Sequence, residues 1–216
     1  MSALGEKGHV FVVAAPSGTG KTTLCARLLE EDPGLTLSVS HTTRDPREGE
    51  ENGVHYHFVD EEAFLALVRE DGFLEHAMYN GNNYGTSFAA IRAPLGNGRD
   101  VVLEIEVQGA EQVRESMEEA ILIFLLPPDL VVLEERLRGR ATDSDAVIAK
   151  RLAIVDRELA AARFFDFAVV NDDLEIAVRQ VLDVINAIRN GEREKAESEH
   201  GRAQVLAAWE ASQPGR

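Results

Sequence analysis

Short apolar runs alternate with stretches of helical period along most of the chain. Four runs are mainly apolar, as expected of strands buried on both faces: residues 9–15, 100–105, 120–126 and 167–170. Helical periodicity appears at residues 21–31, 109–118, 130–138 and 173–189. This alternation predicts an α/β fold in which a parallel sheet carries helices on both faces.

Residues 36–90 interrupt the alternation. They are rich in Gly, Asn, His, Tyr and Thr, and their apolar pieces are short. The predicted elements are a strand at 55–59, a helix at 60–69 and a strand at 73–79. We interpret residues 36–90 as an inserted domain with its own small sheet, which leaves residues 7–35 and 91–190 as the core domain.

Two polar stretches accompany the core. Residues 138–150 contain Gly, Thr, Ser and Asp, and this composition predicts a mobile, exposed segment. Residues 191–216 are rich in Ala, Glu and Arg, and we interpret them as a polar C-terminal extension, either a solvated helix or a frayed tail. The alternative is an oligomer contact, so a homodimer is left open. Trp209 stands alone in this extension as a candidate packing anchor.

Composition narrows the class of protein. The chain has 216 residues, 44% hydrophobic and 28% charged, which suits one globular core with small insertions. No apolar run approaches the roughly 18 residues that span a bilayer, and the N-terminus has no signal-peptide pattern. The single cysteine, Cys25, excludes an internal disulfide framework and is expected in the core. We therefore expect a cytoplasmic protein that does not bind membranes.

The charge argues against nucleic acid as a partner. The net charge is −16, whereas a nucleic-acid surface needs a positive field. Of 22 basic residues only four are lysines. Arginine binds phosphate through a planar, bidentate fork, so an anion site would consist of local arginine clusters.

Residues 15–23 match the phosphate-binding P-loop pattern G-x-x-x-x-G-K-[ST], except that alanine occupies the first glycine position. A buried strand precedes the loop and a helix follows it. Backbone N–H groups of such a loop surround phosphate, the lysine adds a charge, and the hydroxyl after it binds Mg²⁺. The candidate ATP-binding residues here are Ala15, Pro16, Ser17, Gly18, Thr19, Gly20, Lys21, Thr22 and Thr23.

A second candidate phosphate site begins at Ser40. Arg44 and Arg47 flank a proline, and Tyr56 follows, so two guanidinium groups and a phenol could bind one phosphate. The alternative is a polar loop whose charges are merely solvated. The P-loop elsewhere in the chain favours the phosphate site.

These motifs resemble the guanylate kinase family over residues 9–188, and the pattern Ser-x-x-x-Arg-x-x-Arg-x-Gly-Glu-x-x-Gly-x-x-Tyr at residues 40–56 is specific to it. In this family ATP lies on the P-loop and GMP in the inserted domain. The resemblance implies a GMP site of Ser40, Arg44, Arg47, Glu50, Tyr56, Glu75, Tyr84, Thr86 and Glu104. Glu104 stands where the family usually has aspartate.

Guanine chemistry favours Glu75 as the residue that recognises the base. Guanine presents N1–H and N2–H₂ donors on one edge, and one carboxylate accepts both. Adenine has an acceptor at N1 and would leave a buried carboxylate unpaired. The alternative is an ordinary exposed glutamate at a strand end.

The resemblance assigns the remaining site residues. Lys21, Arg44, Arg140 and Arg151 would be catalytic, with Arg140 and Arg151 in or beside a lid at residues 138–150. Arg136 and Asn171 would contact adenine. Glu106 follows a buried strand and would hold Mg²⁺ through water, together with Thr22. His55 and His57 lack a nearby third ligand, so we expect no metal there.

The predicted activity is therefore Mg²⁺-dependent, reversible phosphoryl transfer from ATP to GMP or dGMP in purine nucleotide metabolism. Two alternatives remain. One is a domain that binds phosphopeptides at the GMP site, and the other is a P-loop kinase for a different phosphorylated small molecule. Lys21, Thr22, Arg140 and Arg151 favour catalysis over the binding domain, and Ser40 and Glu75 favour a nucleotide over a sugar phosphate.

Overall fold

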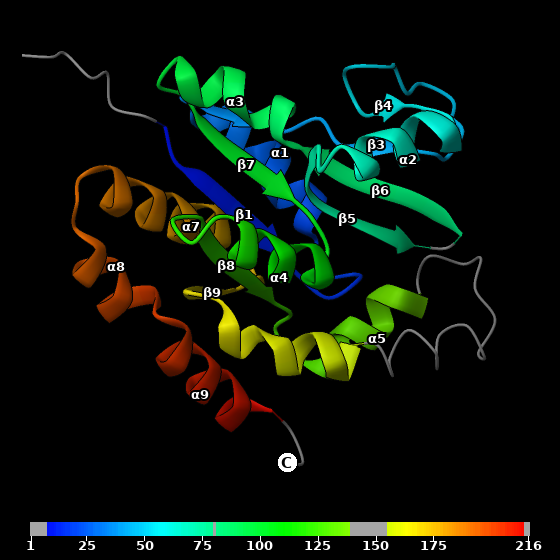
Figure 1. Ribbon diagram of the computed structural model, residues 1–216. Helices are drawn as coiled ribbons and strands as arrows, with labels where there is room; N and C mark the ends of the chain where they lie inside the picture. The colour runs from blue at the N-terminus through cyan, green and yellow to red at the C-terminus, as the bar shows by residue number, and fades with distance from the viewer. Residues whose placement is uncertain (1–7, 80, 139–154, 214–216) are drawn as a thin grey trace, which may run out of the picture. The chain divides into compact units, whose positions relative to one another are not determined.

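The computed structural model describes residues 8–79, 81–138 and 155–213 (Figure 1). The chain divides into two compact units: one holds residues 1–11 and 32–120, and the other holds residues 12–31 and 121–216. Strand β1 (Val10–Ala14) is divided between them, since residues 10–11 are counted with the first unit and residues 12–14 with the second. Both units contain parallel strands and helices, so the predicted α/β fold is confirmed.

The first unit contains a parallel pair, β2 (Leu35–Leu37) with β7 (Asp100–Glu104). It also contains a four-stranded sheet in the order β4-β3-β6-β5. The strands of that sheet are β3 (His41–Thr42), β4 (His57–Phe58), β5 (Phe73–Tyr79) and β6 (Asn82–Ser87). This sheet lies within residues 36–90, where a separate small sheet is predicted. The predicted domain boundaries themselves stay predictions.

Three helices complete the first unit: α2 (Glu61–Arg69), α3 (Phe88–Gly96) and α4 (Val107–Ser116). Asp60 begins α2 because its carboxylate accepts a hydrogen bond from the Ala63 backbone N–H at 2.7 Å. Ser87 caps α3 in the same way, with its hydroxyl 3.2 Å from the Ala90 nitrogen. Helix α4 packs against β5, and this contact matters for the site below.

One predicted strand of this unit is shorter than expected. The pattern at residues 55–59 predicts a five-residue strand, but β4 holds only His57–Phe58. Local hydrogen bonds compete with the sheet here, since the Glu51 carbonyl accepts from the Val54 and His55 backbone N–H groups. The His55 ring nitrogen Nδ1 in turn accepts from the Glu51 backbone at 3.0 Å.

The second unit pairs β8 (Ile121–Leu126) with β9 (Phe167–Val170) in parallel. Its helical elements are α1 (Lys21–Glu31), α5 (Leu130–Arg138), the 3₁₀ turn η1 (Ala162–Phe164), α7 (Leu174–Arg189), α8 (Arg193–His200) and α9 (Arg202–Ser212). Helix α1 packs on α7, and Cys25 is buried in α1 as predicted. Among the described residues, no helix has both the length and the apolarity to cross a membrane.

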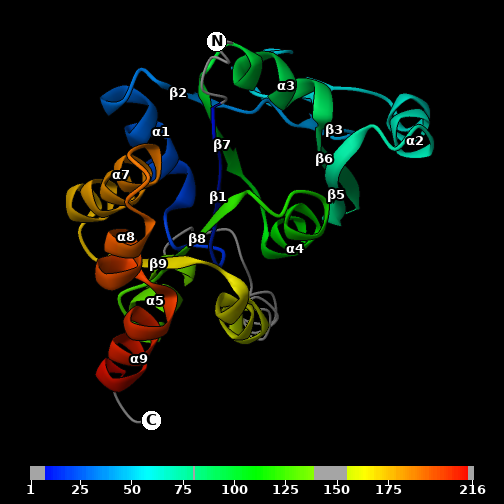
Figure 2. The ribbon, with the colours of Figure 1, turned by 60° about the vertical axis from the view of Figure 1, so that its left-hand side comes forward.

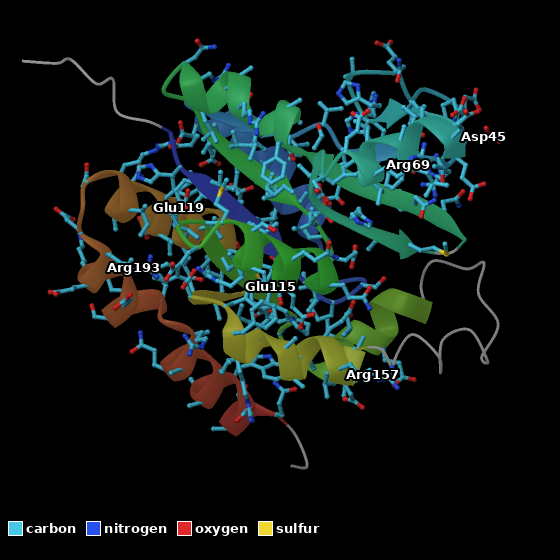
Figure 3. All side chains as sticks on the ribbon, viewed as in Figure 1. Asp45, Arg69, Glu115, Glu119, Arg157 and Arg193 are labelled. Carbon is cyan, nitrogen blue, oxygen red and sulfur yellow. The ribbon has the colours of Figure 1, made fainter. Side chains whose placement is uncertain are left out.

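The C-terminal extension is helical, which is one of the two forms predicted for it. Residues 193–212 form α8 and α9 rather than a frayed tail, and Figure 2 shows α8 between α7 and α9. Gly201 forms a bridge with Phe167 of β9, and Arg193, labelled in Figure 3, pairs with Asp166 at 3.0 Å. Trp209 is 5% exposed and its indole N–H donates to the Pro127 carbonyl at 2.6 Å. The prediction that Trp209 anchors this segment is confirmed.

Candidate active site

A cavity of about 200 Å³ lies in the first unit, where α4 and β5 pack together. Its lining residues are Ser40, Tyr56, Glu75, Ala77, Tyr84, Gly85, Glu104, Ile105, Glu106 and Gly109. Six elements or the loops beside them supply these residues, which are far apart in the sequence. The cavity therefore brings together residues predicted for guanine, for the GMP phosphate and for Mg²⁺.

One end of the cavity is polar and buried. The Glu75 side chain is on β5 and the residue is 6% exposed, while Thr86 of β6 is fully buried. Glu75 Oε1 accepts a hydrogen bond from the Thr86 backbone N–H at 2.8 Å. The hydroxyl groups of Ser40 and Thr86 lie 3.2 Å apart. Three of the four residues that the resemblance assigns to guanine thus form one hydrogen-bonded cluster, and Glu104 is the fourth.

The arginine motif lies beside Tyr56, which lines the cavity, and forms the other end of the candidate site. The Arg44 guanidinium binds the Glu50 carboxylate through two parallel hydrogen bonds of 2.9 Å. Glu50 also accepts from the Arg47 backbone N–H at 2.7 Å. The hydrogen bond from Arg44, and then that from Arg47, lowers the pKa of the Glu50 carboxyl to about 2. In this structure Glu50 orients Arg44, and its predicted contact with GMP stays a prediction.

Two tyrosines lie beside Arg44. The Arg44 guanidinium carbon is 5.5 Å from the centre of the Tyr56 ring, and the Tyr56 and Tyr84 rings meet edge to face at 6.1 Å. Burial, followed by the charge of Glu104, raises the pKa of Tyr56. The phenol is therefore a neutral hydrogen-bond donor, which is the form that binds a phosphate oxygen.

Two carboxylates line the cavity from the segment that connects β7 to α4. Glu104 ends β7 and is partly buried. Glu106 is the N-cap residue of α4 and its side chain makes no capping hydrogen bond. The assignments of Glu104 to guanine and Glu106 to Mg²⁺ stay predictions.

The P-loop belongs to the second unit and has the predicted context, with β1 before it and α1 after it. Gly18 and Gly20 have φ of 90° and 96°, a backbone conformation that favours glycine. Ala15 is buried, and Asp71 is the only non-glycine among the described residues with a positive φ. Alanine is tolerated at position 15 because the backbone there needs no glycine.

Asn171 contacts the P-loop, which the sequence analysis did not predict. Its amide donates to the Thr19 carbonyl at 2.7 Å, and it is 6% exposed. A Cβ atom on Gly20 would lie 2.8 Å from the Asn171 amide nitrogen. Asn171 therefore supports the loop. Its position directly after a buried strand is the signal that could have revealed this role, and its predicted adenine contact stays a prediction.

Several predicted residues cannot be placed. Arg140, Arg151 and the lid beyond residue 138 lie outside the described residues, as does the side chain of Arg136. Lys21, Thr22 and Thr23 form the first turn of α1, which contains no acidic residue. The rings of His57 and His41 lie 4.7 Å apart, centre to centre, and are tilted by 35°.

Comparisons with known proteins agree with this geometry. The family model for guanylate kinase matches residues 7–188. The chain is 55% identical over 184 residues to a guanylate kinase from Neisseria gonorrhoeae, covering 85% of this chain and 90% of the relative. It is 48% identical over 185 residues to one from Vibrio cholerae, covering 85% and 89%.

A solved structure shares the fold. The crystal structure of guanylate kinase from Anaplasma phagocytophilum matches with a TM-score of 0.69 and 30% identity, covering 89% of this chain and 95% of that one. Family model, curated relatives and solved structure therefore all agree. The chain belongs to the guanylate kinase family.

Proposed function

We propose that this chain transfers the γ-phosphoryl group of ATP reversibly to GMP or dGMP, giving ADP and GDP or dGDP. The observation that carries the proposal is the buried Glu75 carboxylate, hydrogen-bonded beside Ser40 and Thr86 in a cavity. A buried carboxylate that lines a cavity is well placed to accept hydrogen bonds from a ligand. Guanine offers two on one edge, and a reaction on nucleotides fits the predicted cytoplasmic location.

Selectivity for guanine follows from this arrangement. Glu75 accepts from N1–H and N2–H₂ of guanine, and Ser40 and Thr86 complete the polar end of the site. Adenine has no N1–H, so it would offer the buried carboxylate fewer hydrogen-bond donors than guanine does. A site built around a substrate hydrogen bond rejects analogues that lack it far more strongly than an apolar pocket does.

The GMP phosphate would bind at the arginine end. Arg44 uses three N–H donors on Glu50 and the Asp45 carbonyl, and the guanidinium has five. The remaining donors serve Tyr84 and a phosphate oxygen. Arg47 and Tyr56 add a second guanidinium and a neutral phenol.

The ATP phosphates would bind the P-loop backbone and Lys21. The phosphate oxygen of GMP is already anionic, so it attacks the γ-phosphorus without a general base, and ADP leaves with the electron pair of the broken bond. Positioning and charge neutralisation supply the catalysis. We assign the neutralising role on the transferring group to Lys21, Arg44, Arg140 and Arg151.

We propose that Thr22 and Glu106 hold Mg²⁺, and that Arg136 and Asn171 lie near adenine. Hydroxyl and carboxylate oxygens are the hard ligands that Mg²⁺ prefers, so these residues fit the ion chemically. When bound, Mg²⁺ would supply positive charge that neutralises the phosphates during transfer.

A substrate panel tests the proposal. With ATP and Mg²⁺, the purified chain is assayed by a coupled reaction against GMP, dGMP, IMP, AMP, UMP and a sugar phosphate. We expect turnover with GMP and dGMP far above that with AMP or UMP. A preference for AMP or the sugar phosphate would reject the proposal. Binding of a phosphopeptide without any turnover would instead indicate an interaction domain.

A further inference from the structure

Helix α4 contacts the backbone of β5 directly beside Glu75. The Gln112 side-chain carbonyl accepts from the His76 backbone N–H at 3.0 Å, and its amide donates to the His76 carbonyl at 2.9 Å. Strand β5 is the outer strand of its sheet, so these backbone groups have no neighbouring strand to bind. One side chain therefore replaces a strand neighbour at the residue after Glu75.

Gly109 lies one turn before Gln112 on the same face of α4. A Cβ atom on Gly109 would lie 2.6 Å from Glu75 Oε2, a distance that real Cβ atoms do not adopt. The other carboxylate oxygen, Oε1, is held by the Thr86 backbone N–H at 2.8 Å. The carboxylate could therefore yield to a new methyl group only by straining or breaking that hydrogen bond.

We propose that α4 determines the position of the Glu75 carboxylate, with Gly109 and Gln112 as positioning residues for guanine selectivity. Gly109 admits the carboxylate close to the helix, and Gln112 fixes the strand that carries it. This inference rests on the proposed function, in which Glu75 recognises the base.

The consequence for catalysis is geometric. Two hydrogen bonds from one guanine edge require both carboxylate oxygens to face the cavity at the correct distance. A displacement of about 1 Å can cost on the order of 10²-fold in rate. The helix that carries Gly109 and Gln112 would thereby control which base is accepted, although neither residue is required to touch the nucleotide.

The first test compares two glycine substitutions in helices. Gly109→Ala adds a methyl group against Glu75. Gly96→Ala adds one in α3, where nothing lies within 4 Å, and serves as the matched control. For Gly109→Ala we expect the KM for GMP to rise about tenfold or more and the preference for GMP over IMP to fall, with the KM for ATP unchanged. Gly96→Ala should behave as wild type.

The second test uses Gln112. Gln112→Ala leaves the His76 backbone groups to water, and we expect a rise of about threefold in the KM for GMP with the ATP KM unchanged. Gln108→Ala, on an exposed position of the same helix, is the control. Melting temperatures are recorded for every variant. A purely structural defect would lower the melting temperature and the apparent kcat while leaving the KM for GMP and the base preference unchanged, and that result would overturn the inference.

A double-mutant cycle separates the inference from the proposed function. In a Glu75→Ala background the methyl group of Gly109→Ala has no carboxylate to displace, so it should cause no further loss of selectivity. Fully additive losses would contradict the inference. If Glu75→Ala leaves the base preference intact, the proposed function of Glu75 fails. If Glu75→Ala removes the preference while both Gly109→Ala and Gln112→Ala retain it, only the inference fails.

Discussion

The two ends of the candidate site in the first unit, one proposed to bind guanine and the other the GMP phosphate, hold their polar groups in different ways. At the guanine end, Glu75 and Thr86 are buried and joined by a hydrogen bond from the backbone. At the phosphate end, Arg44 is held by Glu50, and their side chains are 15% and 17% exposed. Backbone and helix geometry fixes the first end, whereas a charge pair within reach of solvent orients the second.

This difference indicates a division of labour. A buried hydrogen bond discriminates between ligands because an unsatisfied partner is costly in a dry site. A partly exposed charge pair attracts any phosphate, but water and salt screen it. Base selectivity should therefore depend on the guanine end, and general affinity for nucleoside monophosphates on the phosphate end.

The largest expected effect comes from Glu75→Gln. The amide places an N–H₂ donor where guanine also presents donors, so one hydrogen bond is lost and a repulsive contact replaces it. We expect kcat/KM for GMP to fall by about 10²-fold or more, and the ratio of kcat/KM for GMP to kcat/KM for AMP to fall as well. Steady-state kinetics with both nucleotides measure these values, and Glu62→Gln at an exposed position of α2 is the control. An unchanged GMP-to-AMP ratio would contradict the division of labour.

The next effect comes from Glu50→Gln, which removes the charge that orients Arg44. Glu50 is ionised throughout the neutral range, since its pKa is about 2. Gln retains one acceptor but not the bidentate ion pair, so Arg44 becomes less well positioned. We expect the KM for GMP to rise about tenfold while the preference for GMP over IMP is retained. A loss of base preference in this variant would show that the two ends are not separate.

Salt should distinguish the two ends in the unmodified protein. Between about 0.05 and 0.5 M KCl, screening weakens the partly exposed charges more than the buried hydrogen bonds. We expect the KM for GMP to rise a few-fold, and the KM for IMP to rise in parallel. The measurement is the ratio of the KM for IMP to the KM for GMP at each salt concentration. A ratio that changes with salt as strongly as either KM would contradict the separation of the two ends.

The sequence predicts these regions unequally well, for physical reasons. The strand–loop–helix conformation around residues 15–23 is predicted correctly because its requirements are local: Gly18 and Gly20 adopt positive φ, and Lys21 begins the helix that follows. Four predicted strands correspond to β1, β7, β8 and β9, since continuous apolar runs can only be buried.

Other features depend on contacts between distant residues. The packing of α4 on β5 brings Gly109 to Glu75 and Gln112 to His76, and no local periodicity encodes that match. The C-terminal extension is mostly polar, so its composition predicts a solvated segment. A few apolar side chains suffice to dock it, among them Leu206 and Trp209.

The smallest expected effect concerns β3, which follows Ser40, where the His41 ring lies 4.7 Å from the ring of His57 on β4 at an angle of 35°. His41 Nδ1 is buried and has no hydrogen-bond partner among the described residues. Burial, and then the proximity of His57, lowers the pKa of His41 below its ordinary value of 6.5. The unfolded chain therefore binds a proton at a higher pH than the folded chain does.

The sign of the pH dependence follows from linkage. Stability that depends on neutral His41 is complete above pH 6.5 and is lost as the pH falls below that value toward the lower folded-state pKa. His41→Asn removes the titrating group, so its melting temperature should fall less between pH 7.5 and 5.5 than that of the wild type. We expect the two decreases to differ by only about 1–3 °C, measured by calorimetry at matched ionic strength. Identical decreases would mean that protonation of His41 does not affect stability. The His41–His57 pair would then support Ser40 and Tyr56 by packing alone.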